Sequence, residues 1–301
     1  MPLGIITTLI LLSLIGVTSY LVVCLLIILL SSKIPRKSVL DLPDWGKTRR
    51  LRIPTVKNKS LEGLMVVPHN IEIPSDDEGG DEWKKNNIPI VLIHGWGRNL
   101  GRMVSRARIY GRHGFITILF SVRDHGESDR EITGMNILRY SEDLASVVHW
   151  WGGPVFLAGH SIGGGAALLV AAREPLVRGV IAEAPPYSLP QSMKYIMRPG
   201  LGVFTPLFAP GLWMIVRSRY FRYHKHHFSP LDAASLILSP VLLIHGTHDN
   251  FFPFEHSSIL HQAIPNSKLW IVKGRNHYDL DSDSMYEFMV IDFINSCLDT
   301  I

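Results

Sequence analysis

A serine flanked by glycines joins an apolar strand to a helix near the middle of the chain. Residues 155–167 read VFLAGHSIGGGAA, so the apolar run predicts a strand and the Ala-rich run after Ser161 predicts a helix. A turn this sharp is strained and holds the hydroxyl exposed above the edge of a sheet. Side chains at Gly159 and Gly163 would collide with the neighbouring strand or the following helix. A plain glycine-rich turn has the same local sequence, so the surrounding segments have to distinguish it from a turn that presents a reactive serine.

Short apolar strands alternate with helical segments from residue 88 onward. The predicted strands cover residues 88–93, 115–120, 155–158, 177–182, 241–244 and 268–272. The predicted helices cover residues 102–112, 141–151, 162–173, 254–263 and 281–298. This alternation predicts an α/β fold with a mostly parallel sheet and helices on both of its faces. We expect one domain over residues 56–301, long enough to bury a full core.

Two loops that follow later strands carry the other groups that a nucleophilic serine needs. The strand over residues 241–244 leads to Asp249, and the strand over residues 268–272 leads to His277. Because catalytic groups of such sheets gather at the carboxyl ends of strands, we expect these loops to converge with Ser161. The order of serine, acid and histidine is that of α/β-hydrolases and differs from that of chymotrypsin and subtilisin.

On these residues the chain resembles the α/β-hydrolase superfamily, in its monoglyceride-lipase-like and serine-aminopeptidase-like branch. The elbow GHSIGG matches that branch, and SVRDHGES over residues 121–128 is similar to its DxRGHGxS loop. Ser121 stands where the loop usually has Asp, and Asp124 where it has Gly. The resemblance covers residues 89–298 and implies an α/β-hydrolase fold with an acyl-transfer activity.

The expected roles follow from the chemistry of an activated serine. Ser161 is the predicted nucleophile, His277 the base that takes its proton, and Asp249 the acid that orients the histidine. The backbone N–H groups of Trp96 and Ile162 are the predicted oxyanion hole.

Other carboxylates stay open as the acid. Glu183 is the main alternative to Asp249, because it also ends a predicted strand. Asp124 and Asp279 are weaker candidates, since one lies in a loop and the other lies next to the histidine in sequence.

The N-terminus is an uncharged stretch of 28 residues, Leu3 to Leu30. About 20 apolar residues cross a bilayer as a helix, so residues 1–32 are predicted to be a single-pass transmembrane anchor. A cleaved signal peptide is the alternative, but it would have a charged start and a shorter apolar core. Residues 33–59 carry a net charge of +7. Residues 33–55 are therefore predicted to be a basic juxtamembrane linker, with the catalytic domain on the cytoplasmic face.

Residues 186–230 interrupt the alternation where α/β-hydrolases commonly carry a cap over the active site. The segment is rich in large apolar residues and ends in basic ones. Packing on the sheet accounts for many of the apolar side chains, and the others are expected to line an acyl-binding pocket. The basic end is expected to face anionic lipid headgroups. The segment's prolines, Pro190, Pro199, Pro206 and Pro210, predict short helices.

No cofactor or metal is expected. No cysteine and histidine cluster has zinc-ligand spacing, and the histidines of residues 224–227 lack carboxylate or cysteine neighbours in sequence. The charge outside residues 33–59 is −3, so a basic footprint for nucleic acid is missing from the folded domain.

The sequence therefore favours a membrane-anchored serine hydrolase of carboxylic esters or thioesters. The expected partners are a small-molecule acyl ester, with membrane lipids among the substrates, and the membrane itself through the N-terminal helix. A peptidase or amidase of the same fold is a second hypothesis. A catalytically silent binding or scaffold protein is a third, and retention of Ser161, Asp249 and His277 together argues against it.

Overall fold

The computed structural model describes most of the chain in two units. The described residues are 3–31, 43–72, 81–131, 135–188, 192, 201–221 and 229–299. One unit comprises Met1–Ile34 and Leu189–Phe228, and the other comprises Pro35–Ser188 and Ser229–Ile301. The histidines of residues 224–227 and the basic residues 33–42 of the linker lie outside the described residues.

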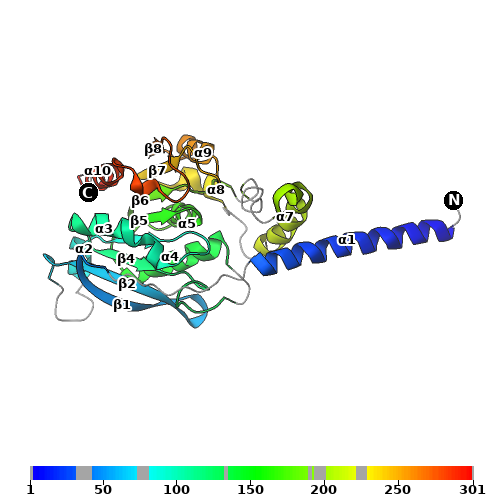
Figure 1. The fold of residues 1–301 in the computed structure, drawn as a ribbon. Helices are drawn as coiled ribbons and strands as arrows, with labels where there is room; N and C mark the ends of the chain where they lie inside the picture. The colour runs from blue at the N-terminus through cyan, green and yellow to red at the C-terminus, as the bar shows by residue number, and fades with distance from the viewer. Residues whose placement is uncertain are drawn as a thin grey trace. The chain divides into compact units, whose positions relative to one another are not determined.

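The larger unit is built on an eight-stranded sheet (Figure 1). Its strand order is β1-β2-β4-β3-β5-β6-β7-β8. The strands are β1 Gly46–Thr55, β2 Lys59–Pro68, β3 Ile90–Ile93, β4 Thr117–Phe120, β5 Val155–His160, β6 Val177–Glu183, β7 Val241–Gly246 and β8 Ser267–Val272. β2 runs antiparallel to both β1 and β4, and the other neighbours are parallel. The predicted mostly parallel sheet is confirmed.

Helices pack on both faces of this sheet. The helices of the larger unit are α2 Asp81–Asn86, α3 Val104–Arg112, α4 Ile137–Trp151, α5 Ile162–Ala171, α8 Pro230–Ala233, α9 Glu255–Ala263 and α10 Tyr286–Leu298. α3 and α10 share one apolar cluster with alternate residues of the central strands. On the other face α5 packs between α4 and α8, and α8 contacts α9. Alternate strand residues therefore face two separate helix layers, as parallel sheets require.

The helix bounds follow local capping signals. α4 begins at Ile137, four residues before its predicted start, because the Asn136 side chain accepts a hydrogen bond from Arg139 N at 3.0 Å. It ends where Gly152 adopts a φ of 75°. α10 begins at Tyr286 and not at the predicted residue 281, because a 3-10 turn over Leu280–Ser282 comes first.

The linker predicted over residues 33–55 is wrong at its C-terminal end. Residues 46–55 form β1, which pairs along its whole length with β2. β1 lies at the edge of the sheet, where basic side chains and Pro54 are tolerated because no further strand pairs there. Only Leu51 and Ile53 are buried, so the sequence shows too little alternation to reveal a strand.

The smaller unit contains two described helices that pack on each other, α1 Leu3–Ser31 and α7 Thr205–Phe221. A 3-10 turn over Gly202–Phe204 precedes α7. α1 holds an apolar span of 27 residues, Gly4–Leu30, with a mean hydropathy of 2.6. Among the described residues it is the helix that is long and apolar enough to cross a membrane.

The prediction that prolines break the cap into short helices is wrong for Pro210. This proline lies inside α7, and the helix continues through it. Pro206 is the second residue of α7, a position that tolerates proline. Pro190 and Pro199 lie outside the described residues.

Candidate active site

Ser161 occupies a strained elbow between β5 and α5. Its φ of 58° and ψ of −126° lie in a region that residues with side chains rarely adopt. The turn is held on both sides, because Ser161 N donates to Glu183 O at 2.7 Å and Ser161 O accepts from Gly165 N at 3.1 Å. The predicted sharp turn is confirmed, and its position places the serine at the carboxyl end of β5.

The glycines around the serine are required by close backbone contacts. A Cβ on Gly159 would lie 2.5 Å from Gly163 O, and a Cβ on Gly163 would lie 2.6 Å from His94 O. The collisions predicted at these positions are therefore confirmed. A Cβ on Gly95 would lie 3.2 Å from Ser161 Cβ, so the loop after β3 lies directly against the elbow.

This juxtaposition follows from the order of the strands. β4 and β5 lie on opposite sides of β3, so the connections after β3 and β5 leave in opposite directions. The carboxyl ends of two such strands enclose a crevice, which is where ligands bind in open α/β sheets.

The loops after β7 and β8 bring Asp249 and His277 together. His277 Nδ1 lies 2.6 Å from Asp249 Oδ2, and both side chains are almost fully buried. Because the carboxylate accepts, Nδ1 carries the proton and Nε2 is left with a free lone pair.

Asp249 is fixed by its whole surroundings. Its Oδ1 accepts from Phe251 N at 2.7 Å and from Phe252 N at 2.8 Å. Its Oδ2 also lies 3.1 Å from His245 Nε2. Burial opposes ionisation of the carboxyl, but the hydrogen bonds from His245, His277 and the backbone outweigh it and hold the pKa of Asp249 well below its usual range. Asp249 is therefore a carboxylate at neutral pH, next to His277.

His277 is held from its backbone as well. His160 Nε2 donates to His277 O at 2.6 Å, and the two imidazole rings lie 4.8 Å apart. Burial, followed by the proximity of His277, holds the pKa of His160 well below its usual value. His160 is therefore a neutral donor. The ring of Phe251 lies 4.9 Å from that of His277 on another side.

No hydrogen bond joins Ser161 to His277 in the part of the chain that the structure describes. Contacts of this kind are often long without substrate. The two predicted oxyanion donors come from adjoining segments. Ile162 is the first residue of α5, where N–H groups lack an intrahelical acceptor, and Trp96 follows the Gly95 loop that lies on Ser161.

The alternative acids are engaged elsewhere. Glu183 accepts from Arg106 Nε at 2.8 Å and from the Tyr286 hydroxyl at 2.5 Å, and all three side chains are buried. Asp124 Oδ1 accepts from Glu131 N at 2.8 Å, and Asp279 Oδ1 accepts from Asn276 N at 2.6 Å. His277 has a hydrogen bond to none of these carboxylates within the described ranges.

The loop over residues 121–128 keeps its shape despite its two departures. Asp124 adopts a φ of 65°, the left-handed conformation for which glycine is the usual residue. Ser121 Oγ donates to Glu62 Oε2 at 2.8 Å and accepts from Leu100 N at 3.2 Å. Arg123 is buried against Asp143, with Nε 2.7 Å from Oδ1. The loop thus has a structural role beside the site.

Sequence reasoning missed the residues that support the histidine and the acid. His160 stands in the elbow motif directly before Ser161, and His245 closes β7 four residues before Asp249. Their place at strand ends was a usable signal. Phe251 and Phe252 carried no such signal in the sequence, because an aromatic pair after a turn is typical of the hydrophobic core.

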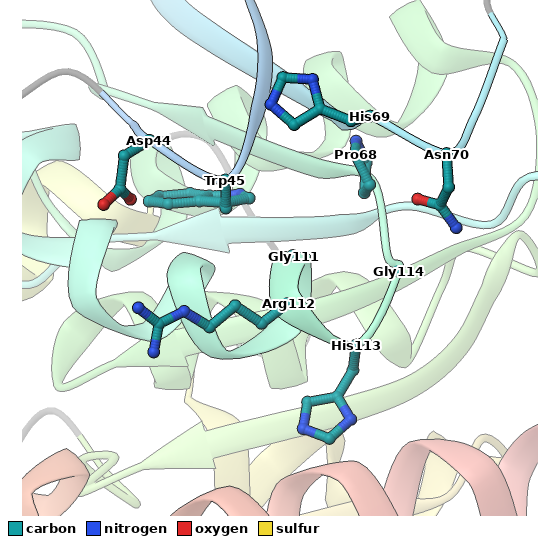
Figure 2. Close-up of a pocket in the computed structure, with 9 residues that line it drawn as sticks. All are labelled: Asp44, Trp45, Pro68, His69, Asn70, Gly111, Arg112, His113 and Gly114. Atoms are coloured by element: carbon teal, nitrogen blue, oxygen red, sulfur yellow. The ribbon is translucent and has the colours of Figure 1, made fainter.

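None of these groups lines a large cavity of about 620 Å³, whose lining residues are drawn in Figure 2. Its lining comes from residues 44–45 before β1, from residues 68–70 at the end of β2, and from residues 111–114 at the end of α3. Residue 114 precedes β4, so the cavity lies at the amino end of that strand, whereas Ser161 follows the carboxyl end of β5. It does not belong to the candidate site. The described residues contain no cluster of three or more potential metal ligands.

The fold and the arrangement of groups at its sheet edge are those of an α/β hydrolase. The family model for serine aminopeptidase, S33, matches residues 84–229, just under half of the chain.

Known proteins agree with this assignment. The bifunctional esterase/perhydrolase of Acinetobacter calcoaceticus is 24% identical over 244 residues, which cover 65% of this chain and 87% of that protein. An esterase of Pyrococcus furiosus superposes with a TM-score of 0.65 at 18% identity, covering 87% of this chain and 98% of that one. A bacterial membrane phospholipase A superposes with a TM-score of 0.61 at 13% identity, covering 98% and 97% of the two chains. The two structural matches show the shared fold.

Proposed function

We propose that this chain is a membrane-anchored serine hydrolase that cleaves a carboxylic ester or thioester with a lipid-like acyl group. The observation that carries the proposal is the 2.6 Å hydrogen bond between His277 Nδ1 and Asp249 Oδ2, in loops at the same sheet edge as Ser161. A buried carboxylate on Nδ1 leaves Nε2 as a base, and a base is what a serine hydroxyl needs to attack.

In the proposed reaction Ser161 Oγ attacks the acyl carbon while His277 Nε2 takes the hydroxyl proton. The imidazolium then gives that proton to the leaving oxygen or sulfur, and the acyl group stays on Ser161 as an ester. A water molecule, deprotonated by His277, attacks this ester and releases the acid. Asp249 stabilises the imidazolium at both stages.

The backbone N–H groups of Ile162 and Trp96 stabilise the charge that develops on the carbonyl oxygen. Each such donor lowers the barrier by about 3 kcal/mol in comparable sites. Their proposed position is supported by the contact of the Gly95 loop with the elbow. The proton acceptor is held in place by His160, which fixes the backbone of His277.

The membrane part of the proposal rests on α1 and on the charges that follow it. The apolar span Gly4–Leu30 ends just before residues 33–59, whose net charge is +7. Basic residues next to a transmembrane helix stay on the cytoplasmic side, so the catalytic unit is proposed to face the cytoplasm. A lipid-like substrate follows from this location, because an anchored enzyme meets esters at the bilayer surface.

A peptidase or amidase is the second candidate, because the matching family model is that of serine aminopeptidases. The same residues would serve it, since His277 would protonate an amine in place of an alcohol. Esters and amides differ mainly in the basicity and reactivity of the leaving group, and the backbone geometry of the site fits both.

Matched substrates separate the candidates. The purified protein and Ser161→Ala should be assayed with acyl p-nitrophenyl esters of increasing chain length and with aminoacyl p-nitroanilides. The proposal expects hydrolysis of the esters, a preference for longer acyl chains and loss of turnover in the variant. Faster cleavage of the anilides would favour the peptidase. If the wild type cleaves neither substrate faster than the variant does, the result favours the third hypothesis, a catalytically silent protein.

A further inference from the structure

The helix α7 is joined to α1 by a hydroxyl that enters its backbone. The Tyr20 hydroxyl donates to Leu207 O at 2.7 Å and accepts from Gly211 N at 3.1 Å. These two backbone groups are four residues apart, so in a regular helix they would bond to each other. The Tyr20 hydroxyl of α1 therefore bonds to a carbonyl and an amide that lie one turn apart in α7.

Pro210 lies between the two backbone groups that this hydroxyl contacts. Proline lacks an N–H, and its ring pushes against the preceding turn, so the helix bends and neighbouring bonds lengthen. The Tyr20 hydroxyl supplies a donor to Leu207 O and an acceptor for Gly211 N, next to this proline. In water such groups would be hydrated, whereas in hydrocarbon a neighbouring helix has to satisfy them.

The two helices also approach closely at the same level. A Cβ on Gly211 would lie 2.5 Å from Tyr20 Cε1 and 2.7 Å from Cys24 Sγ, so only glycine fits there. The rings of Tyr20 and Phe208 stack at 6.1 Å. Small residues at a close helix crossing, with polar bonds across it, are typical of helices packed within membranes.

The contact lies at hydrocarbon depth if α1 spans the bilayer. About 20 residues of a helix cross the hydrocarbon, and the apolar span of α1 has 27, Gly4–Leu30. Every window of about 20 residues within that span contains Tyr20, whichever end of α1 lies at the boundary.

The outward face of α7 suits the same surroundings. Residues 201–216 carry no charge, and four large apolar side chains are exposed: Val203, Phe204, Leu207 and Met214. Val203 in the 3-10 turn before α7, and Leu207 and Met214 in α7 itself, follow one another at intervals of four and seven residues and form one stripe. The apolar helix Gly202–Ile215 is too short to cross a bilayer. Basic residues follow it from Arg217 onward.

We propose that α7 is embedded in the bilayer as a non-spanning helix packed on α1, with the stripe Val203, Leu207 and Met214 in contact with lipid acyl chains. The inference rests on the proposed anchor. It makes the cap insertion a second membrane element of the protein, so that acyl chains of the bilayer, and not water, surround this part of the cap.

Nitroxide labels on single introduced cysteines test this placement. The full-length protein is reconstituted in phosphatidylcholine/phosphatidylglycerol vesicles as Leu207→Cys or Met214→Cys. Leu12→Cys reports on α1, and Leu238→Cys is the control on the catalytic unit. All four native side chains are at least 51% exposed. The unsubstituted protein is the labelling blank, because Cys24 and Cys297 are buried.

Accessibility to oxygen, which dissolves in lipid, is compared with accessibility to a water-soluble nickel chelate. We expect Leu207→Cys and Met214→Cys to match Leu12→Cys, with an oxygen-to-nickel ratio about tenfold above that of Leu238→Cys, because the bilayer core excludes water.

Three results would overturn the inference. Nickel access at the α7 labels with lipid access at Leu12→Cys would put α7 in water and leave the anchor standing. Shielding of the α7 labels from both reagents would mean that protein, such as a second copy of the chain, covers the stripe. Nickel access at Leu12→Cys itself would refute the anchor on which the inference rests.

Discussion

Asp249 receives hydrogen bonds from two backbone amides and two histidines, which makes it the most firmly fixed group of the candidate site. In the proposed triad His277 depends on Asp249 and Ser161 depends on His277, because a carboxylate that is held in one orientation and is charged at neutral pH keeps one tautomer of His277. The acid is therefore the residue at which the proposed triad is most easily separated from its alternatives.

Asp249→Asn should lower turnover of a soluble ester severely, on the order of 10⁴-fold as in the comparable serine triad, because the amide favours the wrong histidine tautomer. Glu183→Gln is the matched carboxylate control and should change turnover per folded molecule far less. Its main effect should be on stability, because the buried Arg106 loses the charge of one of its two carboxylate partners and keeps that of Asp281. If Glu183→Gln lowers turnover more than Asp249→Asn does, the acid is Glu183 at the end of β6.

The same carboxylate predicts a pH dependence of stability. The pKa of Asp249 is lower in the folded protein than its ordinary value of 3.8, so its ionised form stabilises the fold above pH 3.8. That contribution is lost as the pH falls and the carboxylate takes up a proton. The difference in free energy of unfolding between the wild type and Asp249→Asn, measured in urea, should therefore shrink below pH 3.8. A difference that grows on acidification would contradict the assigned pKa direction.

At the scale of elements, the order of strand-end loops could be predicted because it depends on apolar runs and turn residues close in sequence. The ends of the strands that precede Ser161, Asp249 and His277 were predicted to within one or two residues. β1 escaped prediction because an edge strand buries only Leu51 and Ile53 among basic side chains. Pro210 was misleading because α7 continues through it, and we infer that Tyr20, which is distant in sequence, compensates for it by bonding to the backbone on both sides. Such compensation exists only in three dimensions.

Tyr20→Phe should loosen α7 around Gly211 while keeping the ring stacked on Phe208. A hydrogen bond of this kind in a membrane contributes about 1 kcal/mol, so amide exchange of Gly211 should speed up about fivefold. Hydrogen–deuterium exchange of the full chain in lipid nanodiscs measures this. Ser19→Ala, which removes an exposed hydroxyl from the neighbouring position, is the control.

Pro210→Ala supplies the second half of that test. It restores the N–H and relieves the bend, so that Gly211 N can bond to Leu207 O directly. Tyr20→Phe should then have little further effect. Equal acceleration by Tyr20→Phe with proline or alanine at position 210 would show that the hydroxyl does not compensate for the proline.

At the scale of the whole molecule, the proposed membrane and catalytic groups belong to two different units. The proposed anchor α1 and the described part of the cap insertion belong to one unit, and the sheet with Ser161, Asp249 and His277 belongs to the other. The two segments of the smaller unit are more than 150 residues apart in sequence. The proposed role of this unit is to bring the enzyme to lipid substrates.

Deletion of residues 1–32 should release the protein from membranes. It should lower hydrolysis of bilayer-presented lipid esters more than hydrolysis of a soluble short-chain ester, because the sheet unit contains the proposed catalytic groups. Equal loss on both substrates would mean that the anchor only localises the protein and does not give it access to lipid esters in the bilayer.

The orientation is tested in sealed vesicles. Added protease should digest the catalytic unit in inside-out vesicles and spare it in right-side-out ones, because the basic segment after α1 stays on the cytoplasmic side. Protection in the opposite vesicle type would reverse the proposed topology.

The central claim is that Ser161 is an activated nucleophile. A fluorophosphonate reacts covalently with such a serine without requiring the natural substrate, and mass spectrometry of the digested protein identifies the modified residue. We predict one adduct on Ser161, absent from Ser161→Ala, whose folding is checked by circular dichroism. An unlabelled wild type, or undiminished labelling of a folded Ser161→Ala, would contradict the account.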